Sequence, residues 1–249
     1  MEIRAGLLES LARKWWFYLL LFLLSFTPPY TSKPYDPSEI QRIIAEVLNL
    51  SLMPYRRLAP IFHLATIALV ISLFTLGDRA IRAFDAYVSI NYFFIAFAQG
   101  IAHTEYGLSV LFGNIVCLLI VGIYWAWEAL VRKNEFNPRN VPFWKYWVVP
   151  LAILAFWSPL KPEFKPAYLL TSYYGLAFCL TTPVFLSIVS LCQKFNVATL
   201  RVTSFMGALF GVISIALALM EGYIWSGVLH IPLLVISLYC LVLSMKMSR

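Results

Sequence analysis

Eight long runs of mostly apolar residues follow one another along this 249-residue chain. A helix that crosses the hydrocarbon core of a bilayer needs about 20 such residues. Because 61% of the residues are hydrophobic and only 12% are charged, a water-soluble domain of this length would leave a large apolar area exposed. The runs predict an all-α, polytopic transmembrane bundle of about eight spans, folded as a single integral membrane domain over residues 1–249. In chain order the runs cover residues 14–27, 58–76, 81–101, 106–130, 142–160, 168–193, 200–220 and 222–245.

The first run is the shortest and the least certain to cross a membrane. Arg13 and Lys14 precede it, as basic residues precede the apolar part of a signal peptide. However, Thr27, Pro28 and Pro29 follow where a cleavage site would carry small residues. We therefore expect a retained first span, which reaches full length only if residues 7–11 extend its helix.

The distribution of basic residues predicts an orientation for the spans. With the N-terminus in the cytoplasm, thirteen of the nineteen lysines and arginines fall on the cytoplasmic side. Such an excess is typical of cytoplasmic loops, so both termini are expected in the cytoplasm of a multi-pass plasma-membrane protein. In a soluble protein the net charge of +7 would suggest nucleic acid as a partner. Here topology explains the charge, and no nucleic acid is expected.

The loop after the first run contains its own helix signal at residues 36–54. Asp36, Pro37 and Glu39 have the order of a helix N-cap, a proline at the first helical position and a capping-box acid. Isoleucine, valine and leucine then recur with the period of one helix face. This pattern predicts an amphipathic outer helix that lies on the membrane surface or caps the bundle.

The two halves of the chain, residues 1–130 and 142–249, show limited similarity to each other. Residues 62–66 resemble residues 178–182, and Glu105 matches Glu221 at the same offset. Lys14 and Trp16 correspond to Lys145 and Trp147. Two four-span halves would run parallel, as in several transporters with a site at the repeat interface. Chance matching between helices of similar composition is the alternative.

The sixth run is rich in hydroxyl groups and contains a proline. Because a proline inside a helix removes a donor and clashes with the carbonyl four residues back, we expect Pro183 to kink or break this span. A freed carbonyl beside hydroxyls is a solute site in broken transporter helices. The alternative is a structural kink whose carbonyl the threonines satisfy. Amides in the third and fourth runs need partners inside the same bundle. The candidate solute-binding residues are Thr181, Thr182, Pro183, Tyr174, Asn91 and Asn114.

Ionisable residues within or beside the spans are candidates for proton or ion coupling, because they are costly in a membrane. All three histidines and two glutamates are expected toward the outer face, while Asp85 is the deepest charge of the third run. The candidates are His63, His103, Glu105, Glu221, His230 and Asp85. Contacts with water, backbone or each other are the simpler explanation for the outer five residues.

Other charges at the inner ends of the spans are expected to form ion pairs within their own helices. Asp78 and Arg82, like Glu128 and Arg132, are four residues apart, a spacing that brings side chains together on a helix.

Several functions are disfavoured because their motifs are missing. The sequence has no nucleotide-binding glycine motif, no metalloprotease HExxH, no CxxC and no histidine pair with ligand spacing. No cofactor is therefore expected. The favoured function is movement of a small solute or ion without an ATPase of its own, by a chain whose partners are the lipid bilayer, that solute and a second copy or another membrane subunit.

Two other functions stay open. An intramembrane enzyme or redox subunit acting on a lipid or quinone would use the outer histidines and glutamates, with a bound metal or haem. A non-catalytic subunit or scaffold of a membrane complex would pair its polar residues within the bundle or with a partner chain.

Overall fold

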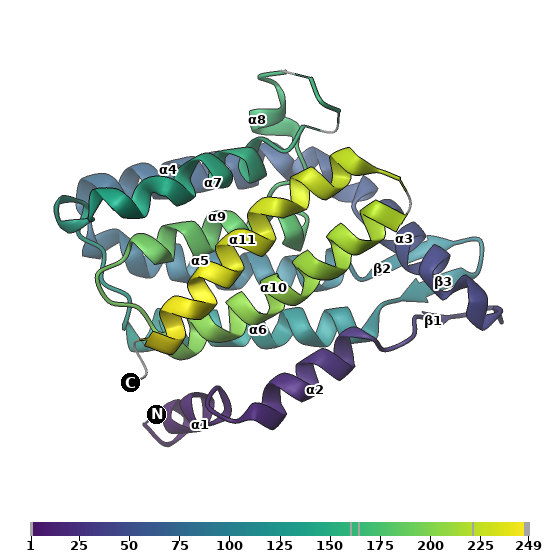
Figure 1. Ribbon diagram of the computed structural model, residues 1–249, viewed down its shortest axis with the longest axis horizontal. Coiled ribbons are helices and arrows are strands. Elements are labelled where there is room, and N and C mark those ends of the chain that lie inside the picture. The colour runs from purple at the N-terminus through teal and green to yellow at the C-terminus, as the bar shows by residue number, and fades with distance from the viewer. Residues whose placement is uncertain (1, 160, 164, 221, 247–249) are drawn as a thin grey trace.

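The computed structural model describes residues 2–159, 161–163, 165–220 and 222–246, and it is dominated by helices (Figure 1). Short 3₁₀ helices introduce or connect several of them: η1 (Pro37–Glu39), η2 (Met53–Leu58), η3 (Pro138–Asn140) and η4 (Phe143–Trp147). The α-helices are α1 (Glu2–Leu11), α2 (Trp15–Ser25), α3 (Ile40–Leu50), α4 (Ala59–Leu76), α5 (Asp78–Ala98), α6 (Phe112–Val131), α7 (Val148–Trp157), α8 (Tyr168–Thr171), α9 (Phe178–Leu191), α10 (Val197–Met220) and α11 (Ile224–Lys246).

The expected all-α class is confirmed. Four helical stretches of the described chain are long and apolar enough to cross a membrane. They are the stretch ending in α4 at Leu76, α6, α10 and α11. α5 has 21 residues but carries charges in its first two turns, and α2, α7 with η4, and α9 are apolar but shorter.

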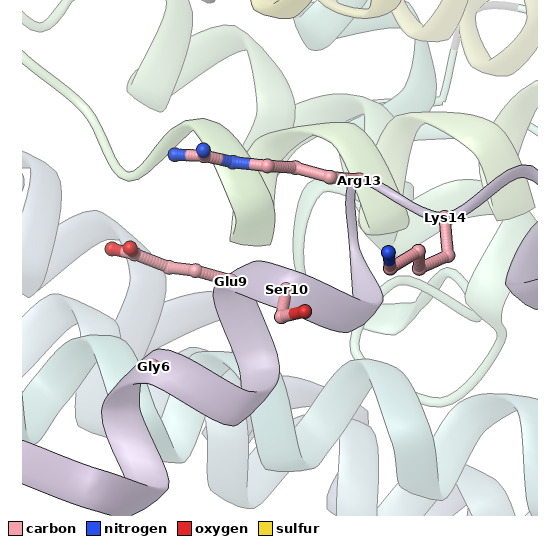
Figure 2. A pocket seen from close by; sticks show the side chains of 5 residues that line it. All are labelled: Gly6, Glu9, Ser10, Arg13 and Lys14. Atoms are coloured by element: carbon pink, nitrogen blue, oxygen red, sulfur yellow. The ribbon is translucent and has the colours of Figure 1, made fainter.

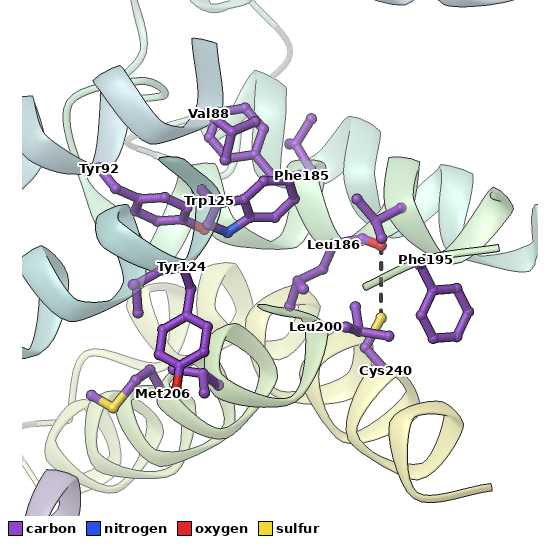
Figure 3. Close-up of a cluster of buried hydrophobic side chains, with 14 of the residues drawn as sticks. Val88, Tyr92, Tyr124, Trp125, Phe185, Leu186, Phe195, Leu200, Met206 and Cys240 are labelled. Atoms are coloured by element: carbon purple, nitrogen blue, oxygen red, sulfur yellow. Dashed lines mark hydrogen bonds between the residues drawn. The ribbon is translucent and has the colours of Figure 1, made fainter. Parts of the chain in front are cut away.

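The bundle is built around α9. Twelve of the fourteen residues of this helix are buried, and it packs against α5, α7, α10 and α11. The antiparallel pairs α5–α6 and α10–α11 form the most extensive helix contacts (Figure 1). Aromatic side chains fill the centre, where the ring of Tyr92 lies 6.5 Å from that of Trp125 and 5.8 Å from that of Phe185 (Figure 3). The interior is thus a packed core, and the polar groups in it are held in place.

The N-terminal segment runs along α6 in two helices rather than one. Near the end of α6 the Tyr124 hydroxyl donates to the Leu8 carbonyl at 2.9 Å, and at its start Gly113 lies against the Leu24 carbonyl. Residues 12–14 separate α1 from α2. The expected extension of the first run into residues 7–11 is therefore present as a separate helix, α1.

One end of the bundle is covered by the amphipathic helix and by a small sheet that was not expected. Strands β1 (Tyr30–Thr31), β2 (Ile101–Thr104) and β3 (Gly107–Val110) pair antiparallel in the order β1-β3-β2. The loop between α5 and α6, expected as a plain turn, is thus a β-hairpin. Ile43 and Val47 of α3 are fully buried against its side chains, which confirms the helix at residues 36–54 and its apolar face.

The sixth apolar run is interrupted, but upstream of the expected position. It forms the single turn α8, an irregular segment at residues 172–177, and then α9, which continues from Phe178 to Leu191 with Pro183 inside it. The expected break at Pro183 is therefore wrong. Gly175, with a backbone φ of +78° that favours glycine, marks the interruption instead.

Candidate functional site

The irregular segment at residues 172–177 lies inside the protein, so its backbone needs hydrogen-bond partners that a helix would otherwise supply. Side chains provide them. The amide of Asn91 on α5 donates to the Gly175 carbonyl at 2.8 Å, and the Gly175 N–H donates to Thr181 Oγ1 at 2.8 Å. The Phe178 N–H donates to Gln99 Oε1 at 3.0 Å. The polar residues of α5 and α9 thus hold an opened stretch of backbone in a defined shape.

The two candidate threonines take part in this arrangement from the first turn of α9. The Thr181 hydroxyl donates to the Ala177 carbonyl at 2.7 Å, while Thr182 Oγ1 accepts a hydrogen bond from the Tyr92 hydroxyl at 3.0 Å. Both threonine side chains are fully buried. In this structure their hydroxyls bond to protein groups and are closed off from solvent.

A chain of three hydroxyls links α4, α5 and the irregular segment. Thr66 Oγ1 lies 2.8 Å from the Tyr174 hydroxyl and 3.0 Å from the Tyr87 hydroxyl, and the Tyr87 hydroxyl donates to the Phe62 carbonyl at 3.1 Å. A hydroxyl carries one proton, so Thr66 must donate to Tyr87 and accept from Tyr174. The direction of the whole chain is therefore fixed.

His63 lies one turn before Thr66 on the buried face of α4. Its Nδ1 is 2.8 Å from the Ala59 carbonyl, and its Nε2 is 3.1 Å from Ser172 Oγ and 3.3 Å from the Phe156 carbonyl. When the ring is neutral with its proton on Nδ1, the single Ser172 proton can serve Nε2 or Phe156 but not both. A proton added to Nε2 would supply the missing donor, at the cost of placing a charged ring in a buried position.

One polar atom of the group has no partner among the described residues. Asn91 is fully buried, and its Oδ1 accepts no hydrogen bond. An unpaired buried acceptor is costly and calls for a partner such as water or a ligand donor. Asn114, near the start of α6, has an unpaired Nδ2, but no recorded contact joins it to Tyr174, Thr181 or Thr182. The structure thus groups four of the six candidate solute residues closely: Asn91, Tyr174, Thr181 and Thr182.

The histidines and glutamates expected at the outer face do not form one cluster. His103 lies in β2, and Glu105 follows it in the turn, where it pairs with Arg42 of α3. The Nδ1 of His230, on α11, is 2.7 Å from the Ser226 carbonyl. Glu221 lies outside the described residues. Across the described part of the chain, no three His, Cys, Asp or Glu side chains are arranged to hold a metal ion.

A second buried polar group, at the opposite end of the bundle, was only partly found from the sequence. Glu128 accepts hydrogen bonds from the Lys133 and Asn134 N–H groups at 2.6 and 2.7 Å and from the Asn196 amide at 2.7 Å. The Asn134 amide donates to Asp85 Oδ1 at 2.9 Å. Both carboxyl groups are almost completely buried. The asparagines, in loops that look polar and exposed in sequence, are the residues that the periodicity analysis missed.

The expected ion pairs within helices are wrong. Asp78 accepts from the Phe136 N–H, and Arg82 donates to the Ala129 carbonyl at 3.2 Å. Among the described residues neither acid, Asp78 nor Glu128, lies within ion-pair distance of its expected arginine. Backbone groups of α6 and of the loop that follows it take the place of the expected partners.

Comparison with known proteins gives no relative: no family model, no curated protein and no solved structure matches this chain. The site must therefore be interpreted from its own geometry.

Proposed function

We propose that this chain moves a small solute or ion across the plasma membrane without an ATPase of its own. The observation that carries the proposal is the buried non-helical segment at residues 172–177, whose backbone is held by side chains of α5 and α9. Interrupted helices of this kind form the solute sites of many transporters. Backbone opened at membrane depth is otherwise costly.

We infer eight crossings, formed by α2, α4, α5, α6, α7, α8–α9, α10 and α11, with α1 in the cytoplasmic interface and both chain ends in the cytoplasm. Two contacts support placing the chain ends together. Arg201, in the second turn of α10, donates to the Ser244 carbonyl near the end of α11 at 2.8 Å and lies 3.5 Å from the Ala12 carbonyl. α2 packs along α6, which supports a first crossing beside it.

The order of helices supports the hypothesis of a parallel internal repeat. α2 and α7 have 11 and 10 residues. Lys14 and the tryptophans at the start of α2 correspond to Lys145 and Trp147 of η4, directly before α7. One helix and one long antiparallel pair come next in each half, α4 with α5–α6 and α9 with α10–α11. α3 and its flanking turns are then an insertion in the first half.

In this proposal the solute binds beside the irregular segment, in contact with Asn91, Tyr174, Thr181 and Thr182. Asn91 Oδ1 supplies a free acceptor, which suits a solute with a hydrogen-bond donor. Pro183 leaves the carbonyl four residues back without its helical donor. Because these side chains are buried, the helices around α9 must separate to admit the solute. In this proposal the other candidate residues control access to the site: Asn114, His103, Glu105, Glu221 and His230.

Protons are the proposed coupling ion, with His63 and Asp85 as the groups that carry them. His63 gains a hydrogen bond when Nε2 is protonated, as shown above. Glu128 accepts three hydrogen bonds and Asp85 one from the neighbouring backbone and amides. Two carboxylates that share a site do not both ionise readily, and hydrogen bonds favour the charged form of Glu128. Asp85 is therefore assigned the proton.

Infrared difference spectroscopy tests that assignment directly. The purified protein should show a carbonyl-stretch band of a protonated carboxylic acid that disappears in Asp85→Asn and persists in Glu128→Gln. The charged groups around this site are Glu128 on α6, Lys145 on η4, and Asp78 and Arg82 on α5. A band that vanishes only in Glu128→Gln would place the proton on Glu128 and contradict its assignment to Asp85.

Flux measurements in liposomes test transport itself. Purified protein is reconstituted with a trapped pH-sensitive dye, and amino acids, sugars, carboxylic acids and inorganic cations are added one at a time. At least one addition should start proton movement that protein-free liposomes lack. The double variant Thr181→Val, Thr182→Val should reduce its initial rate about fivefold or more, since each buried hydrogen bond contributes about 1 kcal/mol.

The matched control is Ser72→Ala, Thr75→Val on α4. These two exposed hydroxyls donate to carbonyls of their own helix, so their removal should leave the rate unchanged. Equal rates in the two double variants would refute the site. Absence of any solute-dependent flux, together with co-purification of one fixed partner chain, would favour a non-catalytic subunit.

A further inference from the structure

The junction between α1 and α2 is held in one place against the bundle. The Tyr18 hydroxyl donates to the Ala12 carbonyl at 2.6 Å, and the Tyr124 hydroxyl donates to the Leu8 carbonyl at 2.9 Å. The guanidinium of Arg201 approaches the Ala12 carbonyl from α10. A turn anchored from three helices presents its own side chains in a reproducible arrangement.

A cleft of about 210 Å³ lies at this junction (Figure 2). Its lining comes from a single stretch of chain: Gly6, Glu9, Ser10, Arg13 and Lys14. Pockets for drug-sized ligands are roughly 300–1,000 Å³, so this cleft is too small for a nucleotide or a drug-sized molecule. It has room for a single charged headgroup and some water.

The charges of the cleft leave two cations free. The Glu9 carboxylate is paired with Lys133, whose ammonium also lies 5.2 Å from the centre of the Trp127 ring. Figure 2 shows the side chain of Arg13 extending in the same direction as that of Glu9, while Lys14 lies apart from both. In the described structure, the side chains of Arg13 and Lys14 are exposed and have no hydrogen-bond or ion-pair partner.

The neighbouring residues place the cleft at the level of lipid headgroups. Trp15 and Trp16 open α2 directly after Lys14, and they are 75% and 45% exposed. Tryptophans at the start of an apolar helix mark the boundary between membrane and water. The charged headgroup of a membrane lipid lies at this depth, so it can reach the cleft without leaving its place in the bilayer.

We propose that this cleft binds a phosphate ester, as presented by the headgroup of an anionic phospholipid. The guanidinium of Arg13 can donate two parallel hydrogen bonds to phosphate oxygens, the ammonium of Lys14 adds a point charge, and the Ser10 hydroxyl adds a donor. Glu9 does not oppose the ligand, because Lys133 neutralises it. The site is independent of the solute site beside α9.

Native mass spectrometry of the purified chain tests the proposal with defined lipids. The protein is titrated with phosphatidic acid, phosphatidylglycerol, phosphatidylcholine and oleate, and separately with inorganic phosphate as a competitor. We expect tight binding of one phosphatidic acid or phosphatidylglycerol molecule. The double variant Arg13→Gln, Lys14→Gln should weaken it by roughly tenfold or more, because each of the two basic residues contributes about fivefold in affinity for an anionic lipid.

The matched control is Arg56→Gln, Arg57→Gln, which removes a second pair of adjacent basic residues. This pair lies in η2, directly before the second apolar run. This control should retain the bound lipid, and unchanged melting temperatures would show that both double variants are folded. Equal loss in the two variants, or equally tight binding of oleate, would overturn the phosphate site. Displacement by inorganic phosphate at similar concentration would assign the site to a free phosphate instead of a lipid.

Discussion

At the scale of single residues, buried hydrogen bonds decide where the acidic side chains of this protein lie. Sequence spacing predicts that Glu128 pairs with Arg132 on one helix face. However, α6 ends at Val131, and Arg132 has a φ of +57° in the left-handed region. The change of backbone direction carries the arginine away and brings two loop N–H groups to Glu128 instead. Helical periodicity contains no information on what happens one residue past the end of a helix.

Removal of the Glu128 carboxylate should therefore be among the most damaging single changes. Glu128→Ala leaves three donors unpaired, of which two are buried and one is partly buried. Each buried donor is worth about 1–3 kcal/mol, and we expect a loss of roughly 3 kcal/mol or more in the free energy of unfolding. Unfolding in mixed detergent micelles measures it. Glu135→Ala removes an exposed pair with Lys194 and should cost about 0–1 kcal/mol. Similar losses in both variants would contradict this account of the Glu128 network.

The N-cap of the outer helix is a residue-level prediction that the structure confirms. Asp36 accepts hydrogen bonds from the hydroxyl and the N–H of Ser38 at 2.6 and 2.8 Å. The Ser38 hydroxyl, and then its N–H, hold the pKa of Asp36 below its usual value. A cap of this kind can be read from sequence because the donor and the acceptor are only two residues apart.

The lowered pKa of Asp36 gives the start of this helix a defined pH dependence. The charged cap is complete above the unfolded pKa of about 3.9 and is lost as the pH falls through the lower folded value. Hydrogen exchange at the Ser38 amide should therefore accelerate in wild type, relative to Asp36→Asn, between about pH 5 and pH 2. The asparagine keeps an acceptor that does not titrate. A constant ratio across this range would show that the carboxylate does not cap the helix.

At the scale of elements, the all-α class and several long apolar helices were predicted correctly from sequence, while the place of the interruption was not. Pro183 is tolerated inside α9, since the helix continues on both sides of it. The run is instead opened at Gly175, where a residue with a Cβ would clash with the Cβ of Phe62 on α4. Sequence shows the glycine but not the neighbouring helix that makes it necessary. The grouping of Asn91 with Thr181 depends on the same tertiary contact.

Two glycine substitutions separate the cost of backbone strain from the cost of this contact. Gly175 and Gly222 both have positive φ, +78° and +75°, but a Cβ on Gly222 would meet nothing within 4 Å. Gly222→Ala should cost about 1–2 kcal/mol for left-handed backbone alone. Gly175→Ala should cost at least about 1 kcal/mol more because of overpacking, as measured by thermal unfolding in detergent. Equal costs would mean that the contact with α4 is easily relaxed.

At the scale of the whole molecule, the proposed topology can be measured with added cysteines. The native cysteines give little background, because Cys117, Cys192 and Cys240 are buried and Cys179 is half-buried. We expect Lys33→Cys, after α2, to react with an impermeant maleimide from outside intact cells. Arg139→Cys, in the loop after α6, should react only from the inside.

This pair of positions tests the three crossings that lie between them, α4, α5 and α6. Labelling of both cysteines from the same side would rule out eight spans with cytoplasmic ends.

The small sheet has a consequence for how the chain is made. β1 pairs through Tyr30 and Thr31 with Val110 and Ser109 of β3, so the sheet cannot form until the ribosome has added almost eighty further residues. At about 5–20 residues per second, the first helix waits in the bilayer for several seconds before its neighbour α6 is complete. α2 is suited to that interval, since it consists of aromatic residues and leucines up to its final serine. In the proposed topology, this strand pairing can form only after the hairpin between α5 and α6 has crossed the membrane, so the sheet closes late in assembly.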